Sequence, residues 1–170
     1  KDAKQVVNML VDVISKNGNL LLSIPIKGDG SIDDKERKIL ADIKAWMDIN
    51  GESIYGTRPW KTFGEGPLAE SANPIHAQGF NERNDYSSKD VRFVQKDGVV
   101  YTTILRWPRV RAVVLKSFGE DSPYYNGEVK SVELLGHGAV PFENRKEGLV
   151  VKLPEQNTND ISPVLAVGFK

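Results

Sequence analysis

Residues 17–60 read NGNLLLSIPIKGDGSIDDKERKILADIKAWMDINGESIYGTRPW and hold the patterns that decide the fold class. Within them, residues 20–24 form a short, almost continuous apolar run that stops at Pro25. This pattern is typical of a strand covered on both faces, as in parallel sheets. Such a strand needs a neighbour on each side, so we expect residues 20–24 to lie buried inside a sheet.

A turn and a helix are predicted directly after this run. Gly28-Asp29-Gly30 is a turn sequence, and Asp33 with Glu36 three residues later forms an aspartate variant of the capping box. We expect a helix from about Asp34 to Asn50-Gly51. Its apolar positions share one side and are Ile39, Leu40, Ile43, Trp46 and Met47.

Another amphipathic helix is predicted before the run. Its apolar residues recur at intervals of three and four positions, and Asn17-Gly18 closes it. They are Val6, Val7, Leu10, Val11 and Ile14. Helix, buried strand and helix form the repeat of an α/β barrel or a doubly wound sheet. Because the chain starts inside this helix, we expect it to be part of a longer protein.

The pattern changes after Trp60. Residues 62–88 have turn residues and few apolar ones, so we interpret them as a linker and divide the chain into domains 1–66 and 67–170. Residues 91–95 and 99–105 flank Lys96-Asp97-Gly98, a strong hairpin signal. Further strands are expected over residues 110–118, 129–135, 149–153 and 163–169. We therefore predict an α+β fold whose second part is an antiparallel β-sandwich.

Composition excludes several classes of partner. The 170 residues include 23 basic and 23 acidic side chains, so no global field attracts nucleic acid or an anionic membrane surface. The absence of cysteine excludes disulfides and thiolate metal sites but leaves the compartment open. No apolar run approaches the roughly 20 residues of a membrane helix.

The quoted stretch resembles a known family. NGNLLLSIPIKGDGSID and NGESIYGTRPW, as a linked pair, are similar to the last strand and helix of the catalytic barrel in α-L-fucosidases of glycoside hydrolase family 29. RFVQKDGVVYTTILRWP, VKSVELLGHG and EGLVVKLPEQNTND resemble strands of the β-sandwich that follows the barrel. The resemblance implies a helix-strand-helix remnant of a (β/α)8 barrel followed by this sandwich. Leu21-Leu22-Ser23 and Pro25-Ile26 depart from the family pattern, which suggests a divergent branch.

The resemblance also implies an activity for the parent protein. Such enzymes hydrolyse terminal α-L-fucosyl linkages in glycans with retention, and this chemistry needs two carboxyl groups about 5 to 5.5 Å apart. In the family these groups lie on earlier barrel strands, so we assign no catalytic residue and expect the chain alone to be inactive. Expected partners of the parent are fucosylated glycans and the N-terminal barrel. A periplasmic or secreted location is implied as well.

Two other functions stay open. The sandwich is also compatible with a carbohydrate-binding module, in which an aromatic such as Trp60 or Trp107 stacks on a sugar. The second open function is that of a structural interaction domain whose apolar helical faces dock elsewhere. For the residues that leave the helix, Asn50-Gly51-Glu52, Tyr55 and Trp60, we favour anchoring of the sandwich against the barrel over sugar contact.

Lys27, Asp29 and Ser31 are the candidate substrate-rim residues. They follow the predicted strand, and the carboxyl ends of barrel strands feed the active site. A glycine-rich turn alone predicts the same residues.

No metal or cofactor is predicted. Five residues fit the second half of a calcium-binding loop: Asp29, Gly30, Ile32, Asp33 and Glu36. Pro25 and Lys27 stand where the first carboxylate ligands belong, so a turn and helix cap is the better interpretation. The adjacent Asp33 and Asp34 point apart at a helix start that keeps both ionised, which disfavours a catalytic pair.

Structural roles are also favoured for the two histidines and for one glycine-rich segment. His76 and His137 are the only histidines, and they lie far apart in a chain without cysteine, which disfavours zinc. Gly64-Glu65-Gly66 lacks the strand-to-helix context of a phosphate loop.

Without the rest of a barrel, residues 20–24 lack neighbouring strands to pair with. An apolar strand edge without partners recruits another strand. We therefore expect the barrel remnant to pack against its own sandwich or against a second copy, as a dimer.

Overall fold

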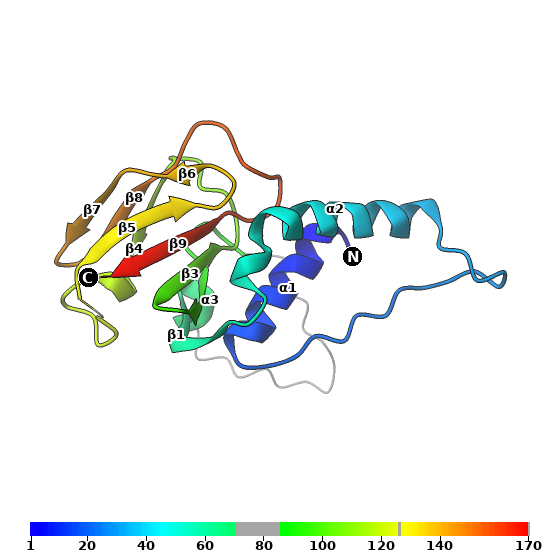
Figure 1. The fold of residues 1–170 in the computed structure, drawn as a ribbon, viewed down its shortest axis with the longest axis horizontal. Coiled ribbons are helices and arrows are strands. Elements are labelled where there is room, and N and C mark those ends of the chain that lie inside the picture. The colour runs from blue at the N-terminus through cyan, green and yellow to red at the C-terminus, as the bar shows by residue number, and fades with distance from the viewer. Residues whose placement is uncertain (71–85, 126, 170) are drawn as a thin grey trace.

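The computed structural model describes residues 1–70, 86–125 and 127–169. Its helices are α1 (Ala3–Ser15), α2 (Asp34–Asn50) and the short α3 (Pro67–Glu70), with 3-10 turns at Gly51–Ser53 and Lys116–Phe118. The strands are β1 (Arg58–Glu65), β2 (Val91–Lys96), β3 (Val99–Ile104), β4 (Ala112–Leu115), β5 (Val129–Leu134), β6 (Gly138–Ala139), β7 (Phe142–Arg145), β8 (Gly148–Lys152) and β9 (Val164–Phe169). This confirms the α+β class (Figure 1).

The strands form two antiparallel sheets. The larger sheet has the order β1-β2-β3-β9-β5-β6, and the smaller has the order β4-β8-β7. The predicted hairpin is confirmed as β2 and β3, with Lys96 paired to Val99. Asp97 and Gly98 between them have φ values of 50° and 81°. Two successive positive φ values match the twist of the strands, as a tight hairpin turn requires.

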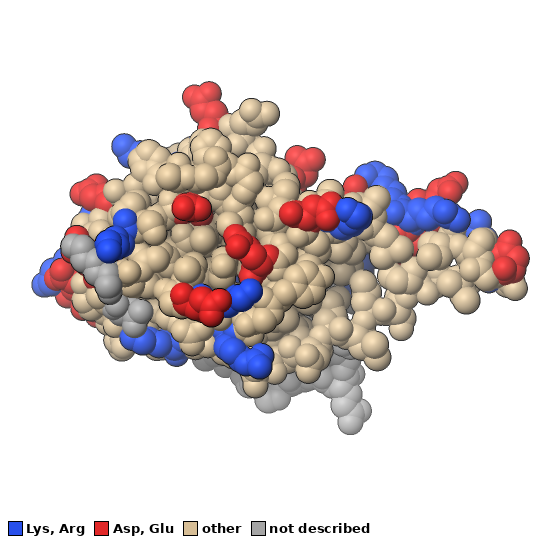
Figure 2. All heavy atoms as spheres, in the orientation of Figure 1, with Lys and Arg blue, Asp and Glu red and all other residues tan. Residues whose placement is uncertain are grey.

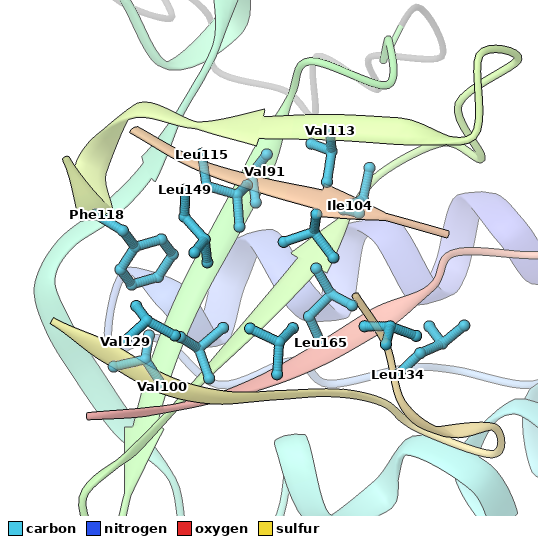
Figure 3. Packing of buried hydrophobic residues seen from close by; sticks show 14 of the residues in the cluster. Val91, Val100, Ile104, Val113, Leu115, Phe118, Val129, Leu134, Leu149 and Leu165 are labelled. Atoms are coloured by element: carbon cyan, nitrogen blue, oxygen red, sulfur yellow. The ribbon is translucent and has the colours of Figure 1, made fainter. Parts of the chain in front are cut away.

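One hydrophobic core lies between the sheets (Figure 3). Its large, fully buried members include Phe93, Ile104, Leu115, Leu134, Leu149 and Leu165. Trp60 from β1 joins them, and its ring centroid lies 5.2 Å from those of both Phe93 and Phe118. Alternation along the strands places these residues inward, because successive side chains point to opposite faces.

A second core covers the outer face of the larger sheet. Helices α1 and α2 lie on this face, and Val7, Val11 and Trp46 pack against Val94 and Val164. The molecule therefore has three layers: helices, six-stranded sheet and three-stranded sheet. Helix α1 thus buries Val6, Val7 and Val11, whereas the predicted apolar side of α2 is half-buried apart from the buried Trp46.

The predicted capping box of α2 is found in part, because Asp33 caps the helix but the Glu36 side chain does not complete the box. The Asp33 carboxylate accepts a hydrogen bond from the Glu36 amide at 2.9 Å, and α2 ends at Asn50. Asp2 and Gln5 form a reciprocal capping box on α1. Such caps satisfy amides that the first helical turn leaves without partners.

The expectation of a buried strand over residues 20–24 is wrong for this structure. The segment is extended but belongs to neither sheet, and the side chains of Leu21 and Leu22 are 94% and 37% exposed. A doubly covered strand needs hydrogen-bonding neighbours, and the described chain places none beside it.

Other boundaries also differ from the predictions. Strand β1 continues to Glu65, inside the segment interpreted as a linker, and residues 110–118 divide into β4 and a 3-10 turn. The short β6 and β7 were not predicted, since two and four residues give little alternation to recognise. His76 lies outside the described residues.

Candidate functional site

An extended arm, residues 19–32, is the feature that the two sheets and helices leave uncovered. Figure 1 shows it leaving α1, reaching beyond the start of α2 and returning to that helix. Residues 19–26 make no backbone hydrogen bond with any residue that the structure describes. Among the described residues, positions 21–23 and 25–30 of the arm are exposed, while Leu20 and Ile24 are half-buried.

Three apolar side chains of the arm, Leu21, Leu22 and Ile26, face solvent, while Leu20, Ile24 and Ile32 are half-buried. Leu21 and Ile26 are 94% and 67% exposed. Helix α1 adds a second apolar stripe beside its sheet-facing one, and its members Met9, Leu10 and Val13 are only half-buried. Exposed apolar side chains such as those of Leu21 and Ile26 are typical of a surface that contacts another protein or another part of the same protein.

The three rim candidates lie together in the turn of the arm. The Lys27 amide donates to the Ser31 carbonyl at 2.8 Å, and Asp29 Oδ1 accepts from the Ser31 amide at 2.9 Å and from its hydroxyl at 2.7 Å. Hydrogen bonds from the Ser31 hydroxyl and amide hold the pKa of Asp29 below its usual value. The backbone of Lys27 and the side chains of Asp29 and Ser31 therefore stabilise the turn, while the side chain of Lys27 is exposed.

The two helices that flank the arm are fixed to the sandwich by a polar joint, which we define as Asn8, Trp46, Leu105 and Ser162. Asn8 Nδ2 donates to the Leu105 carbonyl at 3.2 Å, and the Ser162 hydroxyl donates to Asn8 Oδ1 at 2.8 Å. The Trp46 indole donates to the Ser162 carbonyl at 2.8 Å. All four residues are buried. Buried polar groups with matched partners fix one packing arrangement, here of α1 and α2 on the sheet.

An ion pair provides a second attachment of α1. Arg92 on β2 is 3% exposed, and its Nε lies 2.5 Å from Asp12 Oδ1. The guanidinium also lies over the rings of Phe63 and Tyr86, at 5.4 and 5.8 Å from their centroids. Burial raises the pKa of Asp12, but the charges and hydrogen bonds of Arg92 and Lys16 outweigh it and the net pKa is lowered.

Most of the named residues that follow α2 are buried and have a structural role. Trp60 is buried between the sheets, and Asn50 is fully buried with its Nδ2 donating to the Trp46 carbonyl at 3.0 Å. Tyr55 is the exception, with 68% of its side chain exposed.

Trp107, the other aromatic residue considered for sugar stacking, donates its indole hydrogen to the Asn159 carbonyl at 2.9 Å. The Arg111 guanidinium lies over its ring, 5.6 Å from the centroid.

The Gly64-Glu65-Gly66 segment joins the two sheets. The Glu65 carboxylate accepts from the amides of Lys116 and Ser117 at 2.9 and 2.7 Å. A Cβ at Gly64 would lie 2.3 Å from the Val91 carbonyl oxygen, so no side chain fits there. The predicted loop is instead the end of β1, and sequence analysis missed this structural role of Glu65.

A cleft of about 1240 Å³ opens between β1 and β4. Three partly buried aromatic residues line it: Phe63, Trp107 and Tyr124. Its charged lining residues are four cations, Lys89, Arg106, Arg109 and Lys116, and four anions, Glu65, Glu70, Asp121 and Glu147. The balanced charges give the cleft no net attraction for an ion of either sign.

The acidic and histidine side chains do not assemble into a metal site within the described residues. His137 is exposed in the turn after β5, and Asp33 caps α2. Acidic and basic residues alternate along the exposed face of α2, for example as the pairs Lys38–Asp42 and Lys44–Asp48 (Figure 2). In the described parts of the chain, every helix is too short or too polar to cross a membrane.

These features define a two-sheet antiparallel β-sandwich whose larger sheet is covered by two helices joined by an exposed arm. The sequence matches the family profile described as Alpha-L-fucosidase over residues 1–52. It matches the profile described as Alpha-L-fucosidase C-terminal domain over residues 83–169, just over half of the chain. The chain therefore belongs to the α-L-fucosidase family.

Individual relatives support the same family. The chain is 30% identical over 155 residues to the tissue alpha-L-fucosidase of Rattus norvegicus, covering 91% of this chain and 28% of that protein. It is 28% identical over 158 residues to the plasma alpha-L-fucosidase of Homo sapiens, covering 89% and 28%. The chain thus spans less than a third of the length of these relatives.

Solved structures extend the likeness to the fold. The Thermotoga maritima alpha-fucosidase in complex with fucose has a TM-score of 0.72 and 26% identity, covering 98% of this chain and 34% of that one. The alpha-L-fucosidase isoenzyme 1 from Paenibacillus thiaminolyticus has a TM-score of 0.71 and 26% identity, covering 100% and 35%. The structural match thus extends over nearly the whole of this chain.

Proposed function

We propose that this chain is the C-terminal portion of a retaining α-L-fucosidase that hydrolyses terminal α-L-fucosyl linkages in glycans. In this proposal it supplies the last strand and helices of a (β/α)8 barrel, residues 1–66, and the accessory sandwich, residues 67–170. The observation that carries the proposal is the uncovered apolar arm, held between two helices that are fixed to the sandwich. Strand β1 lies before the boundary between residues 66 and 67 and pairs with β2, which lies after it. The two parts therefore share one sheet.

The partner of the arm is the rest of the barrel. Residues 20–24 form a strand once neighbouring barrel strands bind their free backbone groups, which also covers Leu21 and Leu22. A closed barrel leaves no strand edge in water, so pairing removes an unfavourable exposure. The second apolar stripe of α1 supports this proposal, since barrel helices bury one face against the strands.

The sandwich has a positioning role. The polar joint and the Asp12–Arg92 pair hold α1 and α2 on the larger sheet, so they set where the arm begins and ends. Residues that hold a site in place contribute to catalysis without touching substrate. The catalytic carboxylates then come from the earlier barrel strands, and the chain alone is inactive.

Two assays test this function. The isolated chain is expected to release no 4-nitrophenol from 4-nitrophenyl α-L-fucoside, and turnover by the chain alone overturns the accessory role. In a chimaera, the chain replaces the matching third of the Thermotoga maritima enzyme. Activity is expected in the chimaera and not in that enzyme truncated before the same third. A folded but inactive chimaera contradicts the barrel assignment.

The rim residues stay part of this proposal. We propose that the substrate rim of the complete enzyme includes Lys27, Asp29 and Ser31. Single alanine variants of the active chimaera are then expected to change kcat/KM. Because Asp29 and Ser31 bind each other, Lys27→Ala is the informative variant for direct contact. Unchanged kinetics for Lys27→Ala remove the rim assignment.

The remaining expectations follow from the parent activity. Fucosylated glycans are its substrates, and a secreted or periplasmic location is supported by relatives named plasma alpha-L-fucosidase. The carbohydrate-binding alternative is not favoured, because Trp60 is buried and the ring of Trp107 is covered by Arg111. Without its barrel partner, the chain is also proposed to associate with a second copy through the arm.

A further inference from the structure

The last turn of α1 is held by a charged and aromatic cluster, which we call the helix clamp and define as Asp12, Lys16, Phe63 and Arg92. We infer that the helix clamp positions the active site of the parent enzyme by fixing the direction in which residues 19–24 leave α1. The inference rests on the proposed function, which makes residues 20–24 a barrel strand. It goes beyond that function by separating these positioning residues from contacts that only stabilise the sandwich.

Asp12 lies at the centre of the helix clamp. Its Oδ1 accepts a hydrogen bond from Arg92 Nε on β2 at 2.5 Å, and its Oδ2 accepts one from Lys16 Nζ at 2.8 Å. Both cations also lie over the ring of Phe63 on β1, with Lys16 Nζ 5.0 Å and the Arg92 guanidinium 5.4 Å from its centroid. One carboxylate and one ring thus tie the last turn of α1 to two strands of the larger sheet.

Burial makes the helix clamp selective for one geometry. The Arg92 side chain is 3% exposed, whereas those of Asp12 and Lys16 are 21% and 44% exposed. A nearly buried guanidinium is costly to leave without its counterion, and its planar fork bonds only in certain directions. The clamp therefore resists rotation of the last helical turn more than an exposed pair such as Lys44–Asp48 on α2 does.

The chain leaves α1 through a turn that is built on this last helical turn. The Asn17 amide donates to the Ile14 carbonyl at 3.0 Å, and the Gly18 amide donates to the Val13 carbonyl at 2.9 Å. These are the two hydrogen bonds of a Schellman motif, with Asn17 in the left-handed conformation at a φ of 64°. The direction of the chain after Gly18 therefore follows the orientation of the helical turn that the clamp holds.

The length of the following segment amplifies any change in that orientation. Lys27, a rim candidate, comes nine positions after Gly18, which is about 30 Å of extended chain at about 3.3 Å per residue. A tilt of about 2° at the end of α1 moves Lys27 by about 1 Å, and a misplacement of about 1 Å can lower a rate about 100-fold. Neighbouring barrel strands restrain the segment, so we expect a smaller loss of about tenfold.

Kinetics of the active chimaera test the positioning role. Asp12→Asn is expected to lower kcat about tenfold with KM nearly unchanged, at a temperature where circular dichroism shows every variant to be folded. Glu65→Ala is the matched control, because it removes two hydrogen bonds that join the sheets and none that involves α1. Its kcat should stay within about twofold of the unmodified value. Asp12→Glu, which restores a carboxylate, should recover part of the loss.

Lys16→Met provides a second variant should Asp12→Asn not fold. Lys16 is 44% exposed, so its removal leaves the Asp12–Arg92 pair in place. A loss of kcat smaller than that of Asp12→Asn is expected. Lys44→Met, which removes an exposed pair of the same spacing on α2, should have no effect. Unchanged kcat in the clamp variants, or equal losses in the clamp and control variants, overturns the inference.

Distances in the isolated chain test the helix clamp without activity. The chain has no cysteine of its own, so spin labels attach only to Asn19→Cys on the arm and Lys152→Cys on β8, both exposed positions. Asp12→Asn should broaden the distribution of distances between the labels, and Glu65→Ala should not. Equal widths overturn the inference and leave the chimaera assay of the parent function unaffected. An inactive chimaera with the unmodified sequence removes the proposed function and this inference with it.

Discussion

The carboxylate of Asp12 and the guanidinium of Arg92 join helix α1 to strand β2 across 80 positions of sequence, with 2.5 Å between Oδ1 and Nε. Arg92 is 3% exposed and Asp12 is 21% exposed. The pair therefore bridges the helical layer and the sheet at the edge of the interior. A buried guanidinium depends on its partner, since the charge is costly to desolvate alone.

Asp12→Asn is expected to destabilise the chain by about 2 kcal/mol, because it leaves the Arg92 charge without a counterion. The loss stays below the roughly 3 to 5 kcal/mol of fully buried pairs because Asp12 is partly exposed. Urea unfolding followed by tryptophan fluorescence measures the change. Asp42→Asn is the control, since it removes an exposed helical pair with Lys38. Equal losses for both variants would contradict a special role for Arg92.

The same pair predicts a pH dependence. The folded-state pKa of Asp12 lies below its ordinary value of 3.8, so its contribution to stability is complete above that value and is lost as pH falls through the folded-state pKa. The difference in unfolding free energy between the unmodified chain and Asp12→Asn should be constant near neutral pH and shrink below about pH 4. A difference that grows on acidification is inconsistent with this linkage.

Ser162→Ala tests the polar joint. The substitution removes the hydroxyl that donates to Asn8 Oδ1 and leaves that buried oxygen unpaired, which costs about 1 to 3 kcal/mol. The expected result is a lower midpoint of urea unfolding with an unchanged slope. Ser23→Ala in the exposed arm is the matched control and should leave the midpoint within error. A neutral Ser162→Ala would show that the joint does not stabilise the docked helices.

Glu65→Ala tests the connection between the sheets. It removes two hydrogen bonds from a carboxylate to the amides of Lys116 and Ser117, so about 2 kcal/mol of stability should be lost. Hydrogen exchange of those two amides should accelerate relative to that of β3. Glu70→Ala, an exposed glutamate five residues later, provides the control. Unchanged exchange at residues 116 and 117 would argue against the bridge.

The elements that sequence alone predicted well are those with local signals. The capped helix after Asp33 and the hairpin at Asp97-Gly98 depend on residues close in sequence, and both are found. The segment 20–24 was misassigned because its pattern describes a strand among neighbours that the described chain does not provide. Local pattern specifies the type of element, while burial depends on what lies beside it.

The attachments of the helices could not be predicted from sequence. Asn8, Ser162 and Arg92 are polar residues inside apolar patterns, and their partners lie 80 to 154 positions away. Nothing in the spacing of a single chain identifies such pairs. Lys27, Asp29 and Ser31 were recognisable as a turn, which the hydrogen bonds from Ser31 to Asp29 now explain.

Gly136→Ala tests how closely the turn after β5 approaches helix α2. Gly136 has a φ of 80°, and a Cβ there would lie 2.7 Å from Ile49 Cγ2 on the helix. Gly138, the first residue of β6 after the same turn, has a φ of 101° with nothing within 4 Å of such a Cβ, so it is a matched control for backbone strain alone. Gly138→Ala should cost about 1 to 2 kcal/mol from the positive φ. Gly136→Ala should cost about 1 kcal/mol more, because the methyl group must also displace Ile49. If urea unfolding gives the same loss for both variants, the close contact between this turn and α2 does not contribute to stability, and the docking of α2 depends on the polar joint.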